Sequence, residues 1–441
     1  MVVLFVLAAV AVLAVFAGLH YYAYRRLVRA TTAGPGWPRR LGAAVFVAGP
    51  VLMFAAIAAE RAEAPFPLQR ALAWPGFLWM AFALYLLLAL LVGEAVRPVL
   101  RRVLDRGARR SGPDAAQTGP ELEAGPGSEP EPEPSLGSET KPKPEPEPGL
   151  SSEPKPEPEL GSEVKPGPGR RLVLARGVGI ASAVAAAGIV GNGAYGVLRG
   201  PKVKRVTVPL AKLPRSAHGF RIAVVSDVHL GPVLGRGFAE RVVDIVNGTQ
   251  PDLIAVVGDL VDGTVEDLAP AVAPLARLRS RHGTYFVTGN HEYFSGADPW
   301  VAHVREIGMR PLANARVEMG AFDLAGVNDI SGENYGEGPD YGKALGDRDT
   351  SRAAVLLAHQ PVMIHDAVEH GVDLQLSGHT HGGQLWPGNF VADAANPTLA
   401  GLESYGDTQL YVSRGAGAWG PPVRVGAPSD ITVVELASRQ A

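Results

Sequence analysis

Five short polar clusters in the C-terminal half of the chain carry side chains that can bind metal ions. In chain order they are Asp227-Val228-His229, Gly258-Asp259, Gly289-Asn290-His291-Glu292, His359-Gln360-Pro361 and Gly378-His379-Thr380-His381. Carboxylates, a carboxamide and imidazoles are ligands of divalent cations, and the absence of cysteine excludes thiolate ligands and disulfides. The set exceeds the needs of one ion. It suits two ions about 3.5–4 Å apart with a carboxylate between them.

The spacing inside two clusters supports this interpretation. Asp227 and His229 are two residues apart, as are His379 and His381, and on an extended backbone such residues project to the same side. Glycines beside them let the backbone approach an ion without a Cβ clash. We therefore expect His379 and His381 to serve two different metals.

Each cluster follows a short apolar run that predicts a β-strand. The runs are RIAVVSD, DLIAVVGD, GTYFVTGN, AAVLLAHQ and VDLQLSGH. Stretches with helical character, at 238–247 and 269–279, lie between the early runs. Continuous apolar strands are typical of sheets buried on both faces. In such α/β folds ligands collect at the carboxyl ends of the strands, where all five clusters lie.

The order DxH, GD, GNHE, H and GHxH resembles the calcineurin-like metallophosphoesterase superfamily over residues 220–436. The exact motif sequences are most similar to those of its YkuE-like, membrane-associated branch. They are SDVHLG, GDLVDG, GNHEY, AHQP and SGHTHGGQ. The resemblance implies a four-layer α/β/β/α metallophosphoesterase sandwich with two divalent metal ions and no further cofactor. Mixed histidine and carboxylate ligation favours manganese, iron or zinc.

The resemblance also implies a role for each matching residue. The expected ligands of the first metal are Asp227, His229 and His381. Those of the second are Asn290, His359 and His379, with Asp259 bridging the two ions. His291 would face the phosphate as general acid or transition-state stabiliser.

Two acidic neighbours are harder to assign from the sequence. Glu292 is either an orienting residue behind the ligands or a solvated loop acid. Asp262, in GDLVDG, is expected to be structural. A loop at 331–352 could carry substrate contacts from Tyr335, Tyr341 and Lys343, or be a flexible surface loop.

The rest of the chain is organised around a membrane. Residues 1–110 contain three uncharged apolar stretches, 2–19, 41–59 and 76–93, each close to the length that crosses a bilayer. Residues 111–169 are rich in Pro and Glu and predict a disordered linker. Residues 170–200 predict a fourth transmembrane helix or, after Arg170 and Arg171, a signal anchor resembling twin-arginine export signals. Residues 201–441 form the expected metallophosphoesterase domain.

The distribution of charge bears on the orientation in the membrane and on binding to nucleic acid. Positive-inside counting places the arginine-rich first loop and the linker in the cytoplasm, so a fourth span would deliver the catalytic domain to the outside of a multi-pass cell-membrane protein. The net charge of -3 offers no case for nucleic acid binding.

The sequence therefore predicts a membrane-anchored phosphoesterase that hydrolyses a phosphate mono- or diester by a metal-activated hydroxide. Its location makes lipid-linked or cell-envelope phosphoesters plausible substrates. Two alternatives stay open: a catalytically silent, membrane-tethered binding or scaffold protein with the same fold, and a nuclease.

Overall fold

The computed structural model describes residues 2–110 and 170–440. The predicted linker at 111–169 lies outside the described residues. Contacts between residues divide the chain into two compact units. One comprises Met1–Gly93 together with Arg171–Ala441, and the other is Glu94–Arg170.

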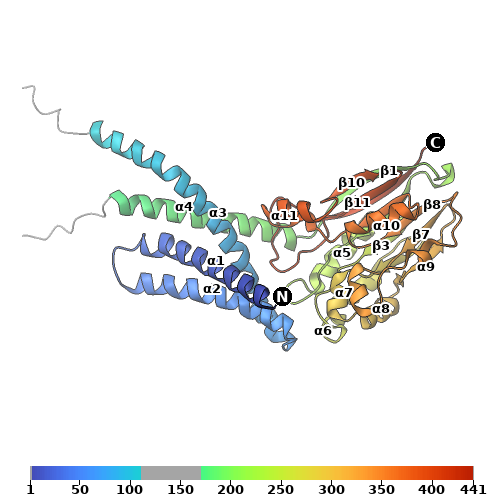
Figure 1. The fold of residues 1–441 in the computed structure, drawn as a ribbon, viewed down its shortest axis with the longest axis horizontal. Coiled ribbons are helices and arrows are strands. Elements are labelled where there is room, and N and C mark those ends of the chain that lie inside the picture. The colour runs from blue at the N-terminus through green and yellow to red at the C-terminus, as the bar shows by residue number, and fades with distance from the viewer. Residues whose placement is uncertain (1, 111–169, 441) are drawn as a thin grey trace, which may run out of the picture. The chain divides into compact units, whose positions relative to one another are not determined.

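Within residues 2–110 and 170–440, four helices are long and apolar enough to cross a membrane (Figure 1). They are α1 (Val2–Tyr24), α2 (Trp37–Arg61), α3 (Phe66–Arg110) and α4 (Arg170–Leu198). Each contains one of the four apolar stretches that the sequence predicts as spans or anchors. Their exposed surface is apolar, with Leu7, Val12 and Val47 all more than 60% exposed, as a lipid-facing surface requires.

Two six-stranded sheets follow. The first has the order β1 (Lys202–Leu210), β12 (Asp430–Ser438), β2 (Phe220–Val225), β3 (Leu253–Val257), β4 (Thr284–Val287) and β5 (Arg310–Pro311). The second has the order β10 (Gly401–Tyr405), β11 (Thr408–Val412), β9 (Leu374–Ser377), β8 (Ala353–Leu357), β7 (Phe322–Gly326) and β6 (Ala315–Glu318). The neighbours β2, β3 and β4 are parallel, as are β7, β8 and β9.

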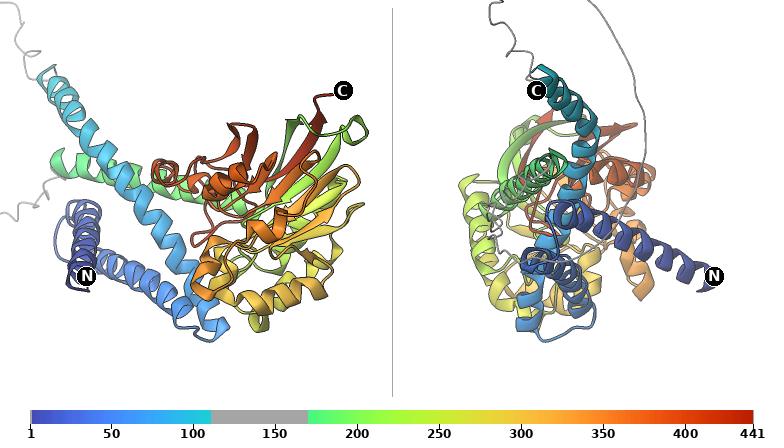
Figure 2. Two further views of the ribbon diagram at one scale, coloured as in Figure 1. Left: turned by 45° about the vertical axis from the view of Figure 1, so that its right-hand side comes forward. Right: turned by 90° about the vertical axis from the view of Figure 1, so that its left-hand side faces the viewer.

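Helices cover the outer face of each sheet (Figures 1 and 2). The first sheet packs against α5 (Arg236–Gly248), α6 (Val265–Val272) and α8 (Ala297–Glu306). The second packs against α9 (Tyr341–Leu345) and α10 (Ile364–Glu369). Two short helices, α7 (Asn290–Ser295) and α11 (Gly388–Ala395), lie in loops. The predicted four-layer sandwich is confirmed.

The side chains of β2 point alternately into two cores, which explains why the strand sequences are continuous apolar runs. Ile222 and Val224 face the core between the two sheets, while Ala223 and Val225 face the core under the outer helices. Both faces of the strand are therefore buried, so no position along it favours a polar residue.

All five predicted strands are present, and one helical stretch differs from the prediction. The stretch 238–247 lies within α5, whereas 269–279 is divided between α6 and a 3-10 helix at Ala273–Arg277. Pro274 explains the break, because it has no N–H to donate to the carbonyl oxygen four residues earlier.

The apolar helices α3 and α4 pack against two loop segments of the sandwich, at 385–386 and 423–425. Leu385, Val423 and Val425 join an apolar cluster with residues of α3 and α4. The Tyr85 hydroxyl of α3 donates a hydrogen bond of 2.9 Å to the carbonyl oxygen of Trp386. The loop that contains Trp386 is therefore fixed against the apolar helix α3.

Candidate metal centre

The structure brings all eight predicted site residues together at one edge of the sandwich. They follow β2, β3 and β4 of the first sheet and β8 and β9 of the second, at the carboxyl ends of parallel strands in each case. They are Asp227, His229, Asp259, Asn290, His291, His359, His379 and His381.

One group of donor atoms comes from the first and last of these loops. Asp227, His229 and His381 each offer an atom within 4.8 Å of the others. The Nε2 atoms of His229 and His381 are 3.0 Å apart, and Nε2 of His381 is 3.4 Å from Oδ1 of Asp227. Oδ2 of Asp227 is buried and has no hydrogen-bond partner among the described residues, so a cation beside it would supply the missing partner.

A second group lies next to the first. Asp259, His359 and His379 also offer atoms within 4.8 Å of one another. Oδ1 of Asn290 is 3.2 Å from Nε2 of His359 and 3.0 Å from Nδ1 of His379. His379 and His381 thus belong to different groups, the arrangement expected of ligands to two ions.

Asp259 connects the two groups. Its Oδ2 atom is 3.1 Å from Nε2 of His359 in the second group and 3.8 Å from Nε2 of His229 in the first. Nitrogen and oxygen donors in two adjacent groups that share a carboxylate fit a pair of divalent cations.

The backbone is strained at most of these positions. Nine residues other than glycine have positive φ among those described, and five of them belong to the site. The five are Asp227 (53°), His229 (49°), Asp259 (53°), His379 (72°) and His381 (52°). Left-handed geometry costs about 1–3 kcal/mol for such residues and concentrates at functional sites. Here it turns each side chain toward the shared centre.

Two glycines permit the close approach of these loops. A Cβ atom on Gly378 would collide with Ser226 and with Oδ2 of Asp227, and one on Gly289 would collide with Oδ1 of Asp259. The loops after β2, β3, β4 and β9 therefore interlock only because these two positions have no side chain.

Asp262 orients two histidines of the site, a contact that its expected structural role does not include. Its Oδ1 atom lies 3.0 Å from Nδ1 of His229 and 2.6 Å from Nδ1 of His291. Hydrogen bonds of this kind fix the ring orientation of metal-binding histidines. Its place in the loop just after Asp259 is a sequence signal that could have revealed this role.

Glu292 is fully buried, so its interpretation as a solvated loop acid is wrong. Its carboxylate accepts hydrogen bonds from the backbone N–H groups of Asp259, Leu260 and Gly289, at 2.9, 2.8 and 2.6 Å. These bonds tie the loop after β3 to the loop after β4. Glu292 therefore positions Asp259 and Asn290 relative to each other.

Arg424 holds His381 from behind, and no sequence motif pointed to it. The arginine is buried, and its Nη2 atom is 3.0 Å from Nδ1 of His381. Its other guanidinium nitrogens donate to the carbonyl oxygens of Gly417, His381 and Ala427. His359 is held similarly, by a 2.9 Å contact between its Nδ1 and the carbonyl oxygen of Val257.

Burial shifts the pKa of three ligand side chains, whereas the Asp259–His359 pair overrides it, with the pKa of His359 raised and that of Asp259 lowered. Burial lowers the pKa of His379 to about 4, with help from nearby His359, and it lowers the pKa of His381, where the charge of Arg424 adds to the effect. Neutral imidazole is the form that binds metals. Burial also raises the pKa of Asp227, which disfavours an isolated negative charge in this position.

His291 has aromatic neighbours at the rim of the site. Its ring centroid is 5.5 Å from that of Phe294 and 5.6 Å from that of Trp419, and these two side chains are 64% and 51% exposed. His291 also offers an atom within 4.8 Å of His229 and Asp259, so it forms a third donor group with them and borders an apolar, accessible rim.

The loop at 331–352 contributes little to this edge. Tyr341 is buried in the core beside α10 and stacks on His370 at 5.2 Å, so it cannot contact a substrate. Tyr335 is exposed and stacks on Tyr293, three residues after Asn290.

Comparisons with known proteins agree with this geometry. A family model described as calcineurin-like phosphoesterase matches residues 220–383. An uncharacterized metallophosphoesterase of Helicobacter pylori strain J99 is 39% identical over 272 residues, which cover 61% of this chain and 73% of that protein. A transmembrane protein with metallophosphoesterase domain from Bos taurus is 42% identical over 253 residues, 54% of this chain and 57% of that protein. The metallophosphoesterase YkuE of Bacillus subtilis is 28% identical over 277 residues, 59% of this chain and 96% of that protein.

Proposed function

The chain belongs to the calcineurin-like metallophosphoesterases, and from this premise we propose that it is a membrane-anchored hydrolase of phosphate mono- or diesters. One observation carries the proposal: two groups of nitrogen and oxygen donors meet at the carboxylate of Asp259. In this assignment Asp227, His229 and His381 would hold one divalent cation, and Asn290, His359 and His379 would hold the other. Asp259, which lies next to both groups, would be the shared carboxylate.

A pair of divalent cations supplies two things that phosphoester hydrolysis needs, namely neutralisation of the phosphoryl oxygens and a water of lowered pKa. The chain's own residues supply the rest. Glu292 and Asp262 keep the ligand loops and rings in place. His291, outside both expected ligand sets, donates a proton to the departing alkoxide.

Activity of the full-length protein with Mn²⁺ tests this proposal. We expect hydrolysis of p-nitrophenyl phosphate or bis-p-nitrophenyl phosphate, and loss of most of it in Asp259→Asn. Two bound ions with no turnover of any phosphoester would support the silent binding protein instead. Preferential cleavage of single-stranded DNA would support the nuclease.

The apolar rim favours a lipid phosphoester among the possible substrates. The Gln384 side chain bonds to the backbone of Trp419, accepting from its N–H at 3.0 Å and donating to its carbonyl at 2.8 Å. The next residue, Leu385, packs in the cluster of membrane helices. The rim beside His291 is therefore continuous with the part of the protein that a bilayer surrounds.

The same surface continues into α11. Phe390 and Val391 are 64% and 73% exposed, and Trp386, just before the helix, is 48% exposed. Exposed apolar side chains next to spanning helices suit the interfacial region of a bilayer. A phosphoester carried by a membrane lipid could reach His291 along this surface.

The arginine-rich first loop supports an extracytoplasmic catalytic domain, by positive-inside counting. Protease treatment of intact cells tests this orientation. We expect cleavage within residues 201–441 without lysis, and a domain that stays protected until lysis would rule out the outward placement.

A further inference from the structure

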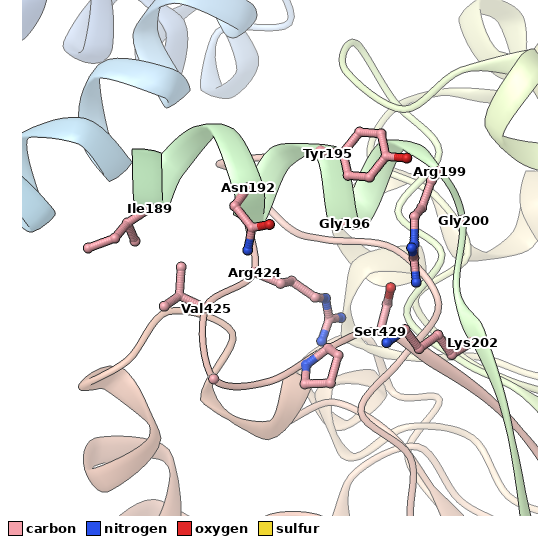
Figure 3. A pocket seen from close by; sticks show the side chains of 12 residues that line it. Ile189, Asn192, Tyr195, Gly196, Arg199, Gly200, Lys202, Arg424, Val425 and Ser429 are labelled. Carbon is pink, nitrogen blue, oxygen red and sulfur yellow. The ribbon is translucent and has the colours of Figure 1, made fainter. Parts of the chain in front are cut away.

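A second concavity lies away from the donor groups, where α4 meets the domain. It has a volume of about 430 Å³ and is formed by the last turns of α4 and the loop at 424–429 (Figure 3). Asn192, Tyr195 and Gly196 contribute from the helix, and Ser429 contributes from the loop. None of these residues belongs to the proposed metal centre.

The lining changes from apolar to cationic along the pocket. Ile189 and Val425 lie at one end, and Arg199 and Lys202 lie at the other (Figure 3). The apolar part of α4 ends at Leu198, so Arg199 is the first charged residue beyond the span. This is the level at which lipid headgroups meet a transmembrane helix.

The positive charge at the cationic end is available to a ligand. Among the residues that the structure describes, neither Arg199 nor Lys202 forms an ion pair. The carboxylate of Asp430, the residue in register with Lys202 across β1 and β12, accepts hydrogen bonds from Ser413 and Thr432 inside the domain. Arg424, also in the lining, uses its guanidinium to hold His381 and nearby carbonyls.

The walls of the pocket are fixed by close backbone contacts. A Cβ atom on Gly193 would come within 2.7 Å of Val423 and 2.8 Å of the Arg424 carbonyl oxygen, so helix and loop touch directly. Lys202 donates its N–H to the carbonyl oxygen of Ser429 at 3.1 Å. In contrast, a Cβ on Gly196 would meet nothing within 4 Å, because the helix faces open space there.

We propose that this pocket binds an anionic phospholipid from the surrounding membrane. Arg199 and Lys202 contact the headgroup phosphate, and the start of an acyl chain lies along Ile189 and Val425. This site holds a lipid without hydrolysing it.

Lipid binding by the full-length protein in neutral detergent tests the proposal. Native mass spectrometry would count bound phosphatidylglycerol, with phosphatidylcholine and inorganic phosphate as parallel ligands. We expect saturable binding of phosphatidylglycerol that weakens at least about tenfold in the double variant Arg199→Gln/Lys202→Gln. Arg215→Gln/Arg305→Gln is the matched control, because it removes the same charge from exposed positions outside the pocket.

A second variant tests the pocket without changing charge. Gly196→Leu would fill the open space and should weaken binding to a similar extent, whereas Gly191→Leu, on the same helix but not in the lining, should not. Equal binding by wild type and both pocket variants would overturn the proposal. So would an equal loss in the Arg215→Gln/Arg305→Gln control, or displacement of the lipid by millimolar phosphate. Turnover is not measured, so failure here is separate from failure of the proposed hydrolysis.

Discussion

The Nδ1 atom of His291 lies 2.6 Å from the Oδ1 atom of Asp262, and this pair determines the charge of the proposed general acid. Burial by itself lowers the pKa of His291. The hydrogen bond and negative charge of Asp262 outweigh that effect and raise the pKa to about 9. His291 therefore carries a proton at neutral pH in the metal-free protein, as a general acid requires.

The charge on His291 predicts how the stability of the metal-depleted protein depends on pH. An unfolded histidine has a pKa near 6.5, so the stabilisation by the Asp262 pair is complete below about pH 6.5 and is lost as pH rises through 9. The free energy of unfolding of wild type should fall as pH rises over this range. In Asp262→Asn we expect this fall to be smaller by on the order of 2 kcal/mol. Denaturant unfolding of EDTA-treated protein at pH 6.5 and 9.5 measures the difference.

If the free energy of unfolding depended on pH in the same way in wild type and Asp262→Asn, the pair would not raise the pKa of His291. His291→Gln serves as the control, because it removes the titrating ring and should flatten the same part of the curve while Asp262 is kept.

Gly289→Ala should weaken metal binding strongly although it replaces no ligand. The added Cβ would collide with Oδ1 of Asp259 and lie 2.6 Å from its backbone nitrogen. We expect metal affinity to fall about 100-fold, the upper range for displaced neighbours of ligands. Gly248→Ala is the matched control, because nothing lies within 4 Å of a Cβ at that position in α5. Isothermal titration with Mn²⁺ gives both affinities, and equal values would refute the interlocked-loop account.

The exposed side chains of α11 should matter for lipid substrates and not for soluble ones. Phe390 and Val391 are exposed, and full burial of such a side chain in a membrane is worth about 1.5–3 kcal/mol. Replacing both by serine removes enough of this energy to change membrane association about tenfold. We expect Phe390→Ser/Val391→Ser to slow hydrolysis of phosphatidic acid in vesicles by about tenfold relative to p-nitrophenyl phosphate. Val368→Ser, on α10, is the control. A proportional loss on both substrates would contradict membrane contact by α11.

The positions of the ligand loops could be predicted from the sequence because their signal is local. Each ligand follows an apolar strand, and neighbouring parallel strands of one sheet end at the same edge, so Asp227 and Asp259 had to lie close together once the strands were identified. His379 follows β9 of the other sheet, and its approach to them depends on how the two sheets pack. The strands themselves were identifiable because burial on both faces leaves an uninterrupted apolar run.

Contacts that depend on how distant loops fold back were not predictable in the same way. Arg424 lies 43 residues from His381 and stands in no motif, so nothing in its local sequence indicates that it holds a ligand ring. The buried environment of Glu292 likewise comes from backbone N–H groups of another loop. Backbone N–H groups are present in almost every residue, so the residue types in the sequence do not indicate which of them will meet Glu292.

The most direct test of the account is the metal content of purified protein and of Asp259→Asn. Because Asp259 touches both donor groups, we expect two divalent ions per chain in the wild type and well under one in the variant. His291→Ala, which alters the proposed acid, should keep two ions while slowing turnover about 100-fold or more. Inductively coupled plasma mass spectrometry against protein concentration gives the count. A wild-type value well under two, or an undiminished value in Asp259→Asn, would contradict the shared-carboxylate centre.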